Sequence, residues 1–292
     1  MGPREPCPCG SGRRYKACHG SPGGAPVAWS SRPFAGLAGE CDLIAMREFV
    51  PAATAPLRLQ GSGREVLLCT LLPGAAPALV REDGTIWLGL QVQHAYGDPS
   101  RDLAAVLQAA LEADSGTVVG LPADPGEGPR LQDLVEGDLD VTVHDGFGYW
   151  TADVADADGS VAAALEQANA TAAPTARLGG VEAAYWTSLG DREFLRWVRP
   201  EDEDALLDAL ARLHAAREDQ LVEGARLIGM FRAHGVLVPV WELPAGTGPE
   251  PLEGPAADFD RRLAETLGDP RPLHTAERAA RSGLTSRQLT IR

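Results

Sequence analysis

The order of apolar and polar residues along the chain predicts a mixture of helices and strands. Apolar residues recur at helical spacing over residues 41–50, 98–113, 160–170, 200–217, 221–233, 256–267 and 275–282. Alternating or short apolar runs predict strands over 65–72, 85–92, 139–143, 149–154 and 236–243, and a hairpin of 182–188 and 193–199 around Gly190-Asp191. The expected fold class is therefore α+β, a body of antiparallel strands with packed helices.

The same pattern predicts how the chain divides. Strand, strand and helix follow one another about three times, which suggests repeated units, although no residue-level repeat is visible. Segments rich in proline and glycine interrupt the pattern. We therefore expect a small N-terminal module, a flexible linker, two α+β subdomains and a C-terminal segment with short helices, over residues 1–20, 21–33, 34–125, 126–250 and 251–292.

Charge and hydropathy restrict where the protein works. The 292 residues include 26 basic and 41 acidic side chains, a formal net charge of −15. No uncharged stretch is longer than that of 66–80, which contains Pro73, Gly74 and Pro77 and is too short and too broken to span a bilayer. The first six residues run directly into a cysteine cluster and do not resemble a signal peptide. We expect a cytoplasmic protein without a membrane span.

The scarcity of lysine disfavours several classes of enzyme. Lys16 is the only lysine, so residues 17–292 offer none for a Schiff base, a GxxxxGK[ST] phosphate loop or a protein kinase strand. The patterns GxSxG, HExxH and GxGxxG are also absent from the sequence. A protein that is not an enzyme is therefore favoured, although side chains that converge in the fold would leave no such pattern.

The cysteine cluster is the strongest chemical signal in the chain. The cluster is a CxC pair, eight intervening residues and then Cys-His, and it consists of Cys7, Cys9, Cys18 and His19. Three thiolates and one imidazole suit tetrahedral zinc, and metal binding would supply most of the folding free energy of so short a module. A disulfide or free thiols are the alternatives, and a reducing cytosol disfavours a disulfide. Two further cysteines lie among apolar residues and are expected to be buried, namely Cys41 and Cys69.

The pattern Cys-Pro-Cys-Gly-Ser-Gly-x-x-Tyr-Lys-x-Cys-His-Gly resembles the SEC-C zinc motif at every position. That motif is known from the C-terminal tail of the SecA preprotein translocase motor. The resemblance implies that the four cluster residues bind zinc and that Arg13, Arg14 and Lys16 form an exposed basic face. In SecA-like proteins the motif contacts a chaperone, and in some relatives the ribosome. The nucleotide motifs of the motor are absent, so motor activity is not implied. The rest of the chain is similar to an uncharacterised SEC-C-containing family of high-GC Gram-positive bacteria.

Charge separates this module from the remainder of the chain. Residues 1–33 carry five basic residues and one acidic residue, whereas 34–292 carry 21 basic and 40 acidic residues, a net charge of −19. The basic residues of the module either contact a partner or are simply solvated. Independent binding to DNA is not expected, because the acidic body repels nucleic acid.

Several side chains of the body are alternative candidates. His94 follows a predicted strand, and Asp98 and Arg101 lie near it at the start of a helix. His144-Asp145 is a candidate acid/base pair, although adjacent strand residues point to opposite faces. Five tryptophans fall on predicted strands, namely Trp87, Trp150, Trp186, Trp197 and Trp241. Packing in the sheet is the simplest explanation for them, and a ligand-binding aromatic face is the alternative.

Two hypotheses about function follow. In the first, the protein is a zinc-binding adaptor whose SEC-C module docks a partner in protein export, quality control or translation. In the second, the α+β body is an enzyme or binds a small ligand, and zinc is purely structural.

Overall fold

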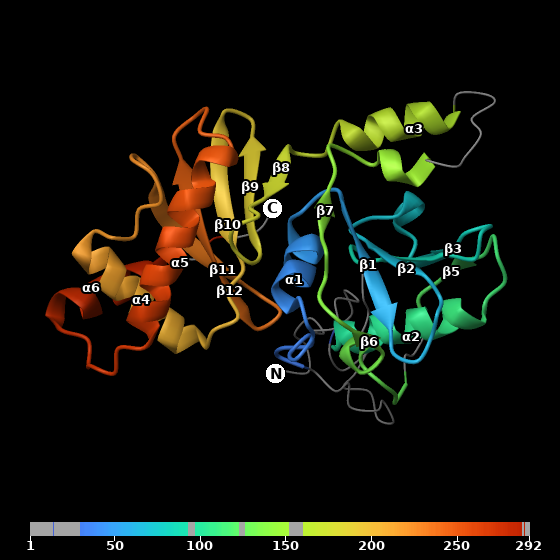
Figure 1. Ribbon diagram of the computed structural model, residues 1–292, viewed down its shortest axis with the longest axis horizontal. Coiled ribbons are helices and arrows are strands. Elements are labelled where there is room, and N and C mark those ends of the chain that lie inside the picture. Colours follow the sequence, from blue (N-terminus) through green and yellow to red (C-terminus); the bar gives the residue numbers. More distant parts are fainter. Residues whose placement is uncertain are drawn as a thin grey trace. The chain divides into compact units, whose positions relative to one another are not determined.

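The chain divides into two compact units that are not continuous in sequence. The computed structural model describes residues 14, 30–92, 97–122, 126–151, 160–287 and 289. The first unit takes its described residues from Met1–Glu40 and Ala53–Thr142, and the second from Cys41–Ala52 and Val143–Arg292. Each unit contains one β-sheet and its own helices (Figure 1), so the fold class is α+β as predicted.

The first unit is built on a mixed sheet with the strand order β5-β3-β4-β2-β1-β6. β2 and β4 are parallel, whereas the other neighbouring pairs of this order are antiparallel. The strands are β1 (Ala53–Leu59), β2 (Val66–Cys69), β3 (Ala78–Val80), β4 (Ile86–Gly89), β5 (Val118–Val119) and β6 (Val135–Glu136). Short 3-10 turns lie at η2 (Pro73–Ala75) and η3 (Leu131–Asp133), and β7 (Thr142–Val143) is the last element before the second unit.

Helix α2 (Pro99–Glu112) covers one face of this sheet. The Asp98 carboxylate accepts a hydrogen bond from the Arg101 amide, and Pro99 occupies the first turn, so the start of the helix is well defined. Leu103 and Leu107 are buried on the helix, and Ile86 and Leu88 are buried on β4. Burial of each such side chain contributes about 1.5–3 kcal/mol, which fixes the helix on the sheet.

The second unit is built on an antiparallel sheet with the strand order β11-β12-β10-β9-β8. Its strands are β8 (Thr175–Arg177), β9 (Ala184–Leu189), β10 (Arg192–Trp197), β11 (Arg226–Ala233) and β12 (Val236–Leu243). Its helices and 3-10 turns are α1 (Glu40–Glu48), η4 (Gly148–Thr151), α3 (Ser160–Asn169), α4 (Glu203–Ala216), η5 (Glu250–Leu252), α5 (Glu253–Leu267) and α6 (Thr275–Ser286).

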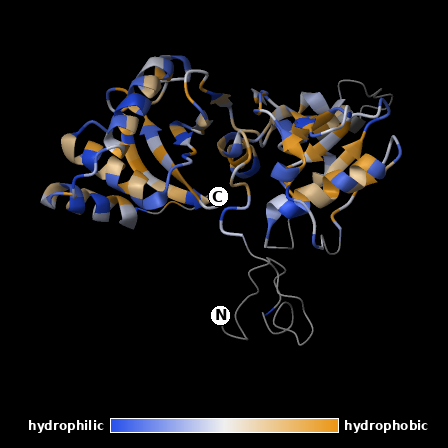
Figure 2. Ribbon diagram, turned by 60° about the horizontal axis from the view of Figure 1, so that its bottom comes forward, coloured by the Kyte–Doolittle hydropathy of each residue, from blue (hydrophilic) through white to orange (hydrophobic). Residues whose placement is uncertain are grey.

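The core of the second unit lies between this sheet and α4 and α5. Trp197, Trp241 and Phe259 meet at ring-centroid distances of 5.2 to 6.3 Å. Figure 1 shows α4, α5 and α6 gathered beside the sheet, and Figure 2 shows apolar residues concentrated on the strands and on parts of the helices. Residues alternate between the two faces of a strand, so Tyr185 and Phe231 lie on the opposite face, where both contact Phe49 after α1.

Most predicted elements are confirmed, among them the helices corresponding to α1, α2, α3, α4, α5 and α6 and the hairpin of β9 and β10. The helix expected over 221–233 is wrong, because residues 226–233 form β11. His234 and Gly235 both have positive φ, at 48° and 83°, and make the tight turn that pairs β11 with β12. Gly229 within this segment also disfavours a helix.

Two further segments differ from expectation. The strand expected over 149–154 is wrong at its start, because Gly148–Thr151 form a 3-10 turn, and its remaining residues lie outside the described part of the chain. β1 had no counterpart among the predicted strands. Its alanines and Pro56 lower its strand propensity, whereas pairing with β2 buries Ala55 and Leu57. Among the residues that the structure describes, no helix is long and apolar enough to cross a bilayer.

Candidate functional site

The predicted zinc ligands Cys7, Cys9, Cys18 and His19 lie outside the described residues, as do Arg13 and Lys16 of the basic face. Arg14 is described, and it is exposed. Within the described ranges, no group of three His, Cys, Asp or Glu side chains is placed to hold a metal ion. The zinc site therefore stays a prediction from the motif.

The two remaining cysteines behave as expected. Cys41 and Cys69 are 1% and 0% exposed. Burial raises the pKa of the Cys69 thiol far above its ordinary value, so this side chain is a neutral apolar group at physiological pH. Neither cysteine has the exposed, electropositive surroundings of a reactive thiol.

The candidate group at the start of α2 serves the local fold. Asp98 caps α2 and also accepts a hydrogen bond from Arg130 Nε at 2.7 Å. Arg101 donates to the carbonyls of Gly126 and Pro129 at 3.2 and 3.1 Å, which holds the loop before η3. His94 lies outside the described residues, so a role for it stays a prediction.

His144 and Asp145 lie beside a hollow of about 430 Å³ that Tyr149 and Asn169 also line. The His144 ring packs 5.1 Å from that of Tyr149. Burial lowers the pKa of His144, and the nearby Asp145 carboxylate opposes this effect. A neutral imidazole beside a carboxylate is compatible with acid/base chemistry, and that role stays a prediction.

Four of the five tryptophans that were expected on strands lie there, and Trp150 lies in η4 instead. Three of their indole N–H groups have fixed internal partners. Trp186 donates to Glu193 Oε2, Trp197 to the Glu182 carbonyl and Trp241 to the Asp219 carbonyl, at 2.8, 2.9 and 2.8 Å. These hydrogen bonds are typical of tryptophan side chains that pack in a sheet and whose indole N–H groups are paired within the protein.

Sequence reasoning missed a cleft of about 920 Å³ between α4 and α6 in the second unit. One wall carries the α4 carboxylates Asp204 and Asp208, which are four residues apart and therefore share a helix face. The other wall is α6, and Pro272 and Leu273 of the loop before α6 also line the cleft. The cleft thus combines opposite charges with an apolar segment.

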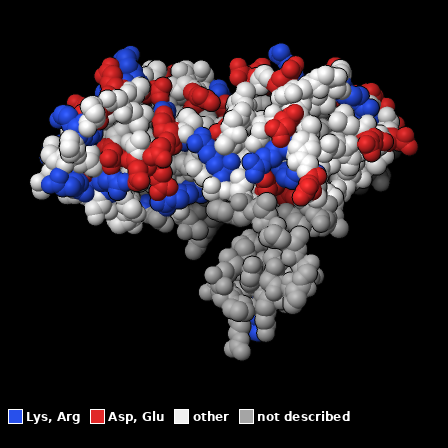
Figure 3. Space-filling model, turned by 90° about the horizontal axis from the view of Figure 1, so that it is seen from below, with Lys and Arg blue, Asp and Glu red and all other residues white. Residues whose placement is uncertain are grey.

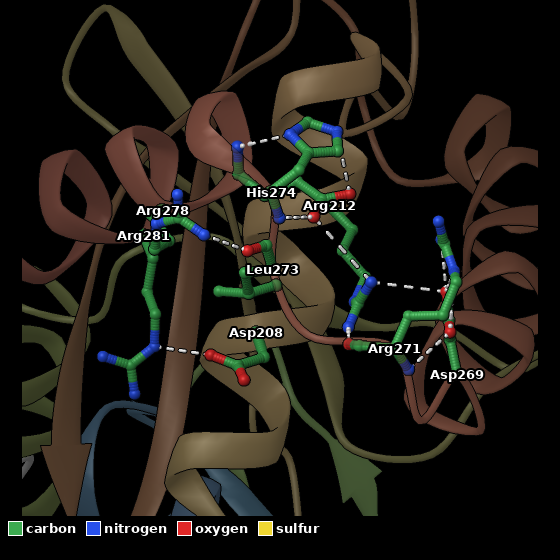
Figure 4. Close-up of polar contacts among 9 residues, drawn as sticks. Asp208, Arg212, Asp269, Arg271, Leu273, His274, Arg278 and Arg281 are labelled. Carbon is green, nitrogen blue, oxygen red and sulfur yellow. Dashed lines mark hydrogen bonds and ion pairs between the residues drawn. The ribbon is translucent and has the colours of Figure 1, made fainter.

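Two arginines of α6 are held in fixed orientations beside this cleft (Figure 4). Arg281 donates from Nε to Asp208 Oδ1 and from Nη2 to Asp204 Oδ1, both at 2.5 Å. Arg278 donates to the Leu273 carbonyl and, at 3.1 Å, to Thr275 Oγ1. Guanidinium groups held in this way have already lost much of their rotamer entropy.

A second polar network fixes the loop before α6, as Figure 4 also shows. The largely buried Arg212 of α4 donates to Asp269 Oδ2 at 3.3 Å and to the Arg271 carbonyl, and lies 3.8 Å from Glu277 Oε2. Hydrogen bonds from Arg271 lower the pKa of Asp269 to about 2. His274 and Glu277 form a reciprocal capping box at the start of α6. The walls of the cleft are therefore rigidly placed.

One signal in the sequence pointed to this region. Residues 271–292 contain five arginines and a single acidic residue, Glu277, within an otherwise strongly acidic body. The partners from α4 could not be found in this way, because about 70 residues separate Asp204 and Asp208 from Arg281. On the face drawn in Figure 3, acidic and basic side chains are interleaved over the described surface.

Comparisons with known proteins match both parts of the chain. The sequence profile of a family described as "Family of unknown function (DUF5926)" matches residues 33–292, and that of the SEC-C motif matches residues 4–21. A protein translocase subunit SecA of Rubrobacter xylanophilus is 57% identical over 30 residues, which cover 10% of this chain and 3% of that protein. No solved structure matches the chain.

Proposed function

This chain belongs to the family of unknown function (DUF5926), and we propose that it is a zinc-binding adaptor. Its SEC-C module binds one zinc ion through Cys7, Cys9, Cys18 and His19. The module then docks a protein partner of the export, quality-control or translation machinery. The acidic body engages a second partner or a ligand.

The complete SEC-C pattern is the observation that carries this proposal. The motif profile matches residues 4–21, and the local likeness to a SecA subunit covers 30 residues of the chain. A CxC pair followed by Cys-His supplies a full tetrahedral set, which is typical of a structural zinc site rather than a catalytic one with an open position. A closed site of this kind shapes a small docking surface and leaves no coordination position for substrate.

Charge indicates which side of the module meets the partner. Arg13, Arg14 and Lys16 follow one another closely between the two halves of the ligand set, and the first 33 residues carry a net charge of +4. An acidic protein surface or a phosphate-rich surface is the natural complement of this face. The acidic body favours the protein surface, because it repels a long polyanion.

The proposal is tested by zinc stoichiometry and partner capture on the full chain. We expect one zinc ion per wild-type chain and none in the Cys7→Ser/Cys9→Ser variant, together with loss of a defined partner. Substitution of Arg13, Arg14 and Lys16 by Gln should keep the zinc and lose the partner. Cys69→Ala serves as the matched cysteine control, because this buried residue lies outside the motif.

Two results would overturn the adaptor proposal. Zinc binding that survives loss of Cys7 and Cys9 would place the metal elsewhere in the chain. Zinc loss without any change in the recovered partners would reduce the module to a structural element. The second result would favour the alternative function, a small-ligand-binding body, for which the cleft between α4 and α6 is the supporting observation.

A further inference from the structure

Three hydrogen-bond donors converge on one face of α6 in the cleft described above. Arg278, Arg281 and Ser282 occupy positions i, i+3 and i+4 of the helix, so their side chains share a face, and all three line the cleft. We propose that this cleft is a binding site for a carboxylate ligand with an apolar body. The residues of this site lie far from the SEC-C motif in sequence.

The two guanidinium groups are oriented before any ligand arrives. Arg281 is fixed by Asp204 and Asp208, yet no acceptor contacts its Nη1 among the described residues. Arg278 is fixed by the Leu273 carbonyl and Thr275, and no carboxylate of the described chain pairs with it. A ligand oxygen can therefore be bound without the entropy cost of immobilising two long side chains.

The hydroxyl groups of α6 are not equivalent. Thr285 Oγ1 donates to the Arg281 carbonyl and Ser286 Oγ to the Gly283 carbonyl, both at 2.8 Å, so their protons are already used within the helix. The Ser282 hydroxyl has no hydrogen-bond partner in the described part of the chain. It is the hydroxyl that donates to the ligand, beside Arg278 one turn earlier.

The neighbouring carboxylates select the charge of the ligand. Asp204 and Asp208 balance the two arginines, so the cleft has no net charge of its own. A dianionic phosphate would meet two carboxylates across the cleft, whereas a single carboxylate needs only the guanidinium donors that face it.

The shape of the cleft indicates what the carboxylate is attached to. Pro272 and Leu273 line it beside the charged groups, and its volume of about 920 Å³ far exceeds that of a bare carboxylate. An aliphatic chain would cover these apolar atoms while its head group meets α6. A small aliphatic acid and the C-terminus of a peptide with an aliphatic last residue both satisfy this description.

The test is an NMR titration of the full-length protein with hexanoate. Backbone amides of residues 278–286 should shift and saturate, with a dissociation constant on the order of millimolar for so small a ligand. Hexanamide, which has the same shape without the charge, should leave these amides unchanged, and phosphate should bind more weakly than hexanoate. A leucine-terminated peptide with a free or an amidated C-terminus distinguishes a peptide source from a free acid.

Variants locate the site. Arg278→Gln and Ser282→Ala should each weaken hexanoate binding, the first by about tenfold or more. Arg261→Gln is the matched control, because this exposed arginine of α5 pairs with Asp258 away from the cleft. Substitution of Arg278 could weaken binding simply by loosening α6. Ser282→Ala is free of this ambiguity, because alanine favours the helix. Equal binding by wild type and both cleft variants, equal shifts with hexanamide, or tighter binding of phosphate would each overturn the proposal.

Discussion

At the scale of single residues, a buried polar triad anchors α1 in the second unit. The Asp42 carboxylate accepts hydrogen bonds from Arg177 Nε and Nη2 at 2.9 and 2.8 Å and from the Tyr185 hydroxyl at 2.5 Å. Burial, together with the Asp42 charge, raises the pKa of Tyr185 well above its ordinary value, so the phenol stays a donor. Sequence patterns did not reveal this triad, because its members come from three separate elements.

We predict that Asp42→Ala destabilises the protein by about 3–5 kcal/mol, because it leaves Arg177 and the Tyr185 hydroxyl without their common acceptor. Tyr185→Phe removes one hydrogen bond and should cost about 1–2 kcal/mol. Urea unfolding followed by tryptophan fluorescence measures both losses. Arg261→Ala breaks an exposed pair and should change the free energy of unfolding by less than about 1 kcal/mol. Equal stability of Asp42→Ala and wild type would show that the triad has no anchoring role.

Glu193 gives a pH-dependent prediction. Burial tends to raise its pKa, but hydrogen bonds from the Gly248 amide, the Trp186 indole and the Gly246 amide outweigh this and lower it. Because the folded pKa lies below the unfolded value, the stabilisation is complete above the unfolded pKa of about 4.3 and is lost as pH falls through the folded pKa. The stability gap between wild type and Glu193→Gln should therefore be constant near neutrality and shrink in acid. Unfolding curves at pH 7, 5 and 3 measure it, and a gap that widens in acid would contradict the sign.

At the scale of elements, strong local signals predicted the fold well. For α4, predicted over 200–217, the Asp202 carboxylate accepts hydrogen bonds from the amides of Asp204 and Ala205 at 3.0 and 3.1 Å, which define the start of the helix. β11 was mistaken for a helix because its apolar residues fit both helical and strand spacing. The His234-Gly235 turn decides for the strand, because it pairs β11 with β12. β1 was missed because its stability comes from pairing with β2 and not from its own propensity.

The edge of β11 offers a test at this scale. The Met230 amide donates to the Arg287 carbonyl, and the Leu289 amide donates to the Met230 carbonyl at 2.9 Å, so Arg287 and Leu289 lie against this edge. A Cβ on Gly229 would overlap the Arg287 carbonyl oxygen. We predict that Gly229→Ala costs about 1–3 kcal/mol and speeds hydrogen exchange at the Leu289 amide.

Gly283→Ala is the matched control for that substitution. A Cβ on Gly283 meets no neighbouring atom, and alanine favours a helix, so this variant should be as stable as wild type or more stable by about 1 kcal/mol. If both glycine variants showed the hydrogen exchange and the unfolding free energy of wild type, the contact of Arg287 and Leu289 with β11 would not contribute to stability.

At the scale of the whole molecule, the candidate sites differ in how far the sequence predicts them. The SEC-C ligands are close together in sequence and follow a spacing that zinc chemistry requires, so the motif was identified and its family profile matches there. The cleft between α4 and α6 depends on tertiary packing, because its two walls come from helices about 70 residues apart in sequence. Asp98 caps a helix and Arg101 holds a loop, and a role for them in a site stays a prediction.

The expected separation of the SEC-C module from the acidic body leads to a prediction about the entire protein. If the zinc module folds independently of the acidic body, removing zinc with a chelator should shift the main thermal transition by less than about 2 °C. Calorimetry of wild type with and without chelator, and of the Cys7→Ser/Cys9→Ser variant, measures this shift. A drop of ten degrees or more would mean that the metal also stabilises the body.

The interrupted course of the chain has a consequence for biosynthesis. Asp42 reaches its partner Arg177 across 135 residues, and the strands of the first unit lie between them in sequence. During translation at roughly 5–20 residues per second, α1 therefore waits on the order of ten seconds for the strands that will cover it. The first unit can complete its own sheet during that time. A nascent chain stalled before residue 177 would display a helix, Glu40–Glu48, whose residues up to Met46 are buried in the folded protein, and this helix would have no fixed docking site. This interval is when a holding chaperone would be of most use.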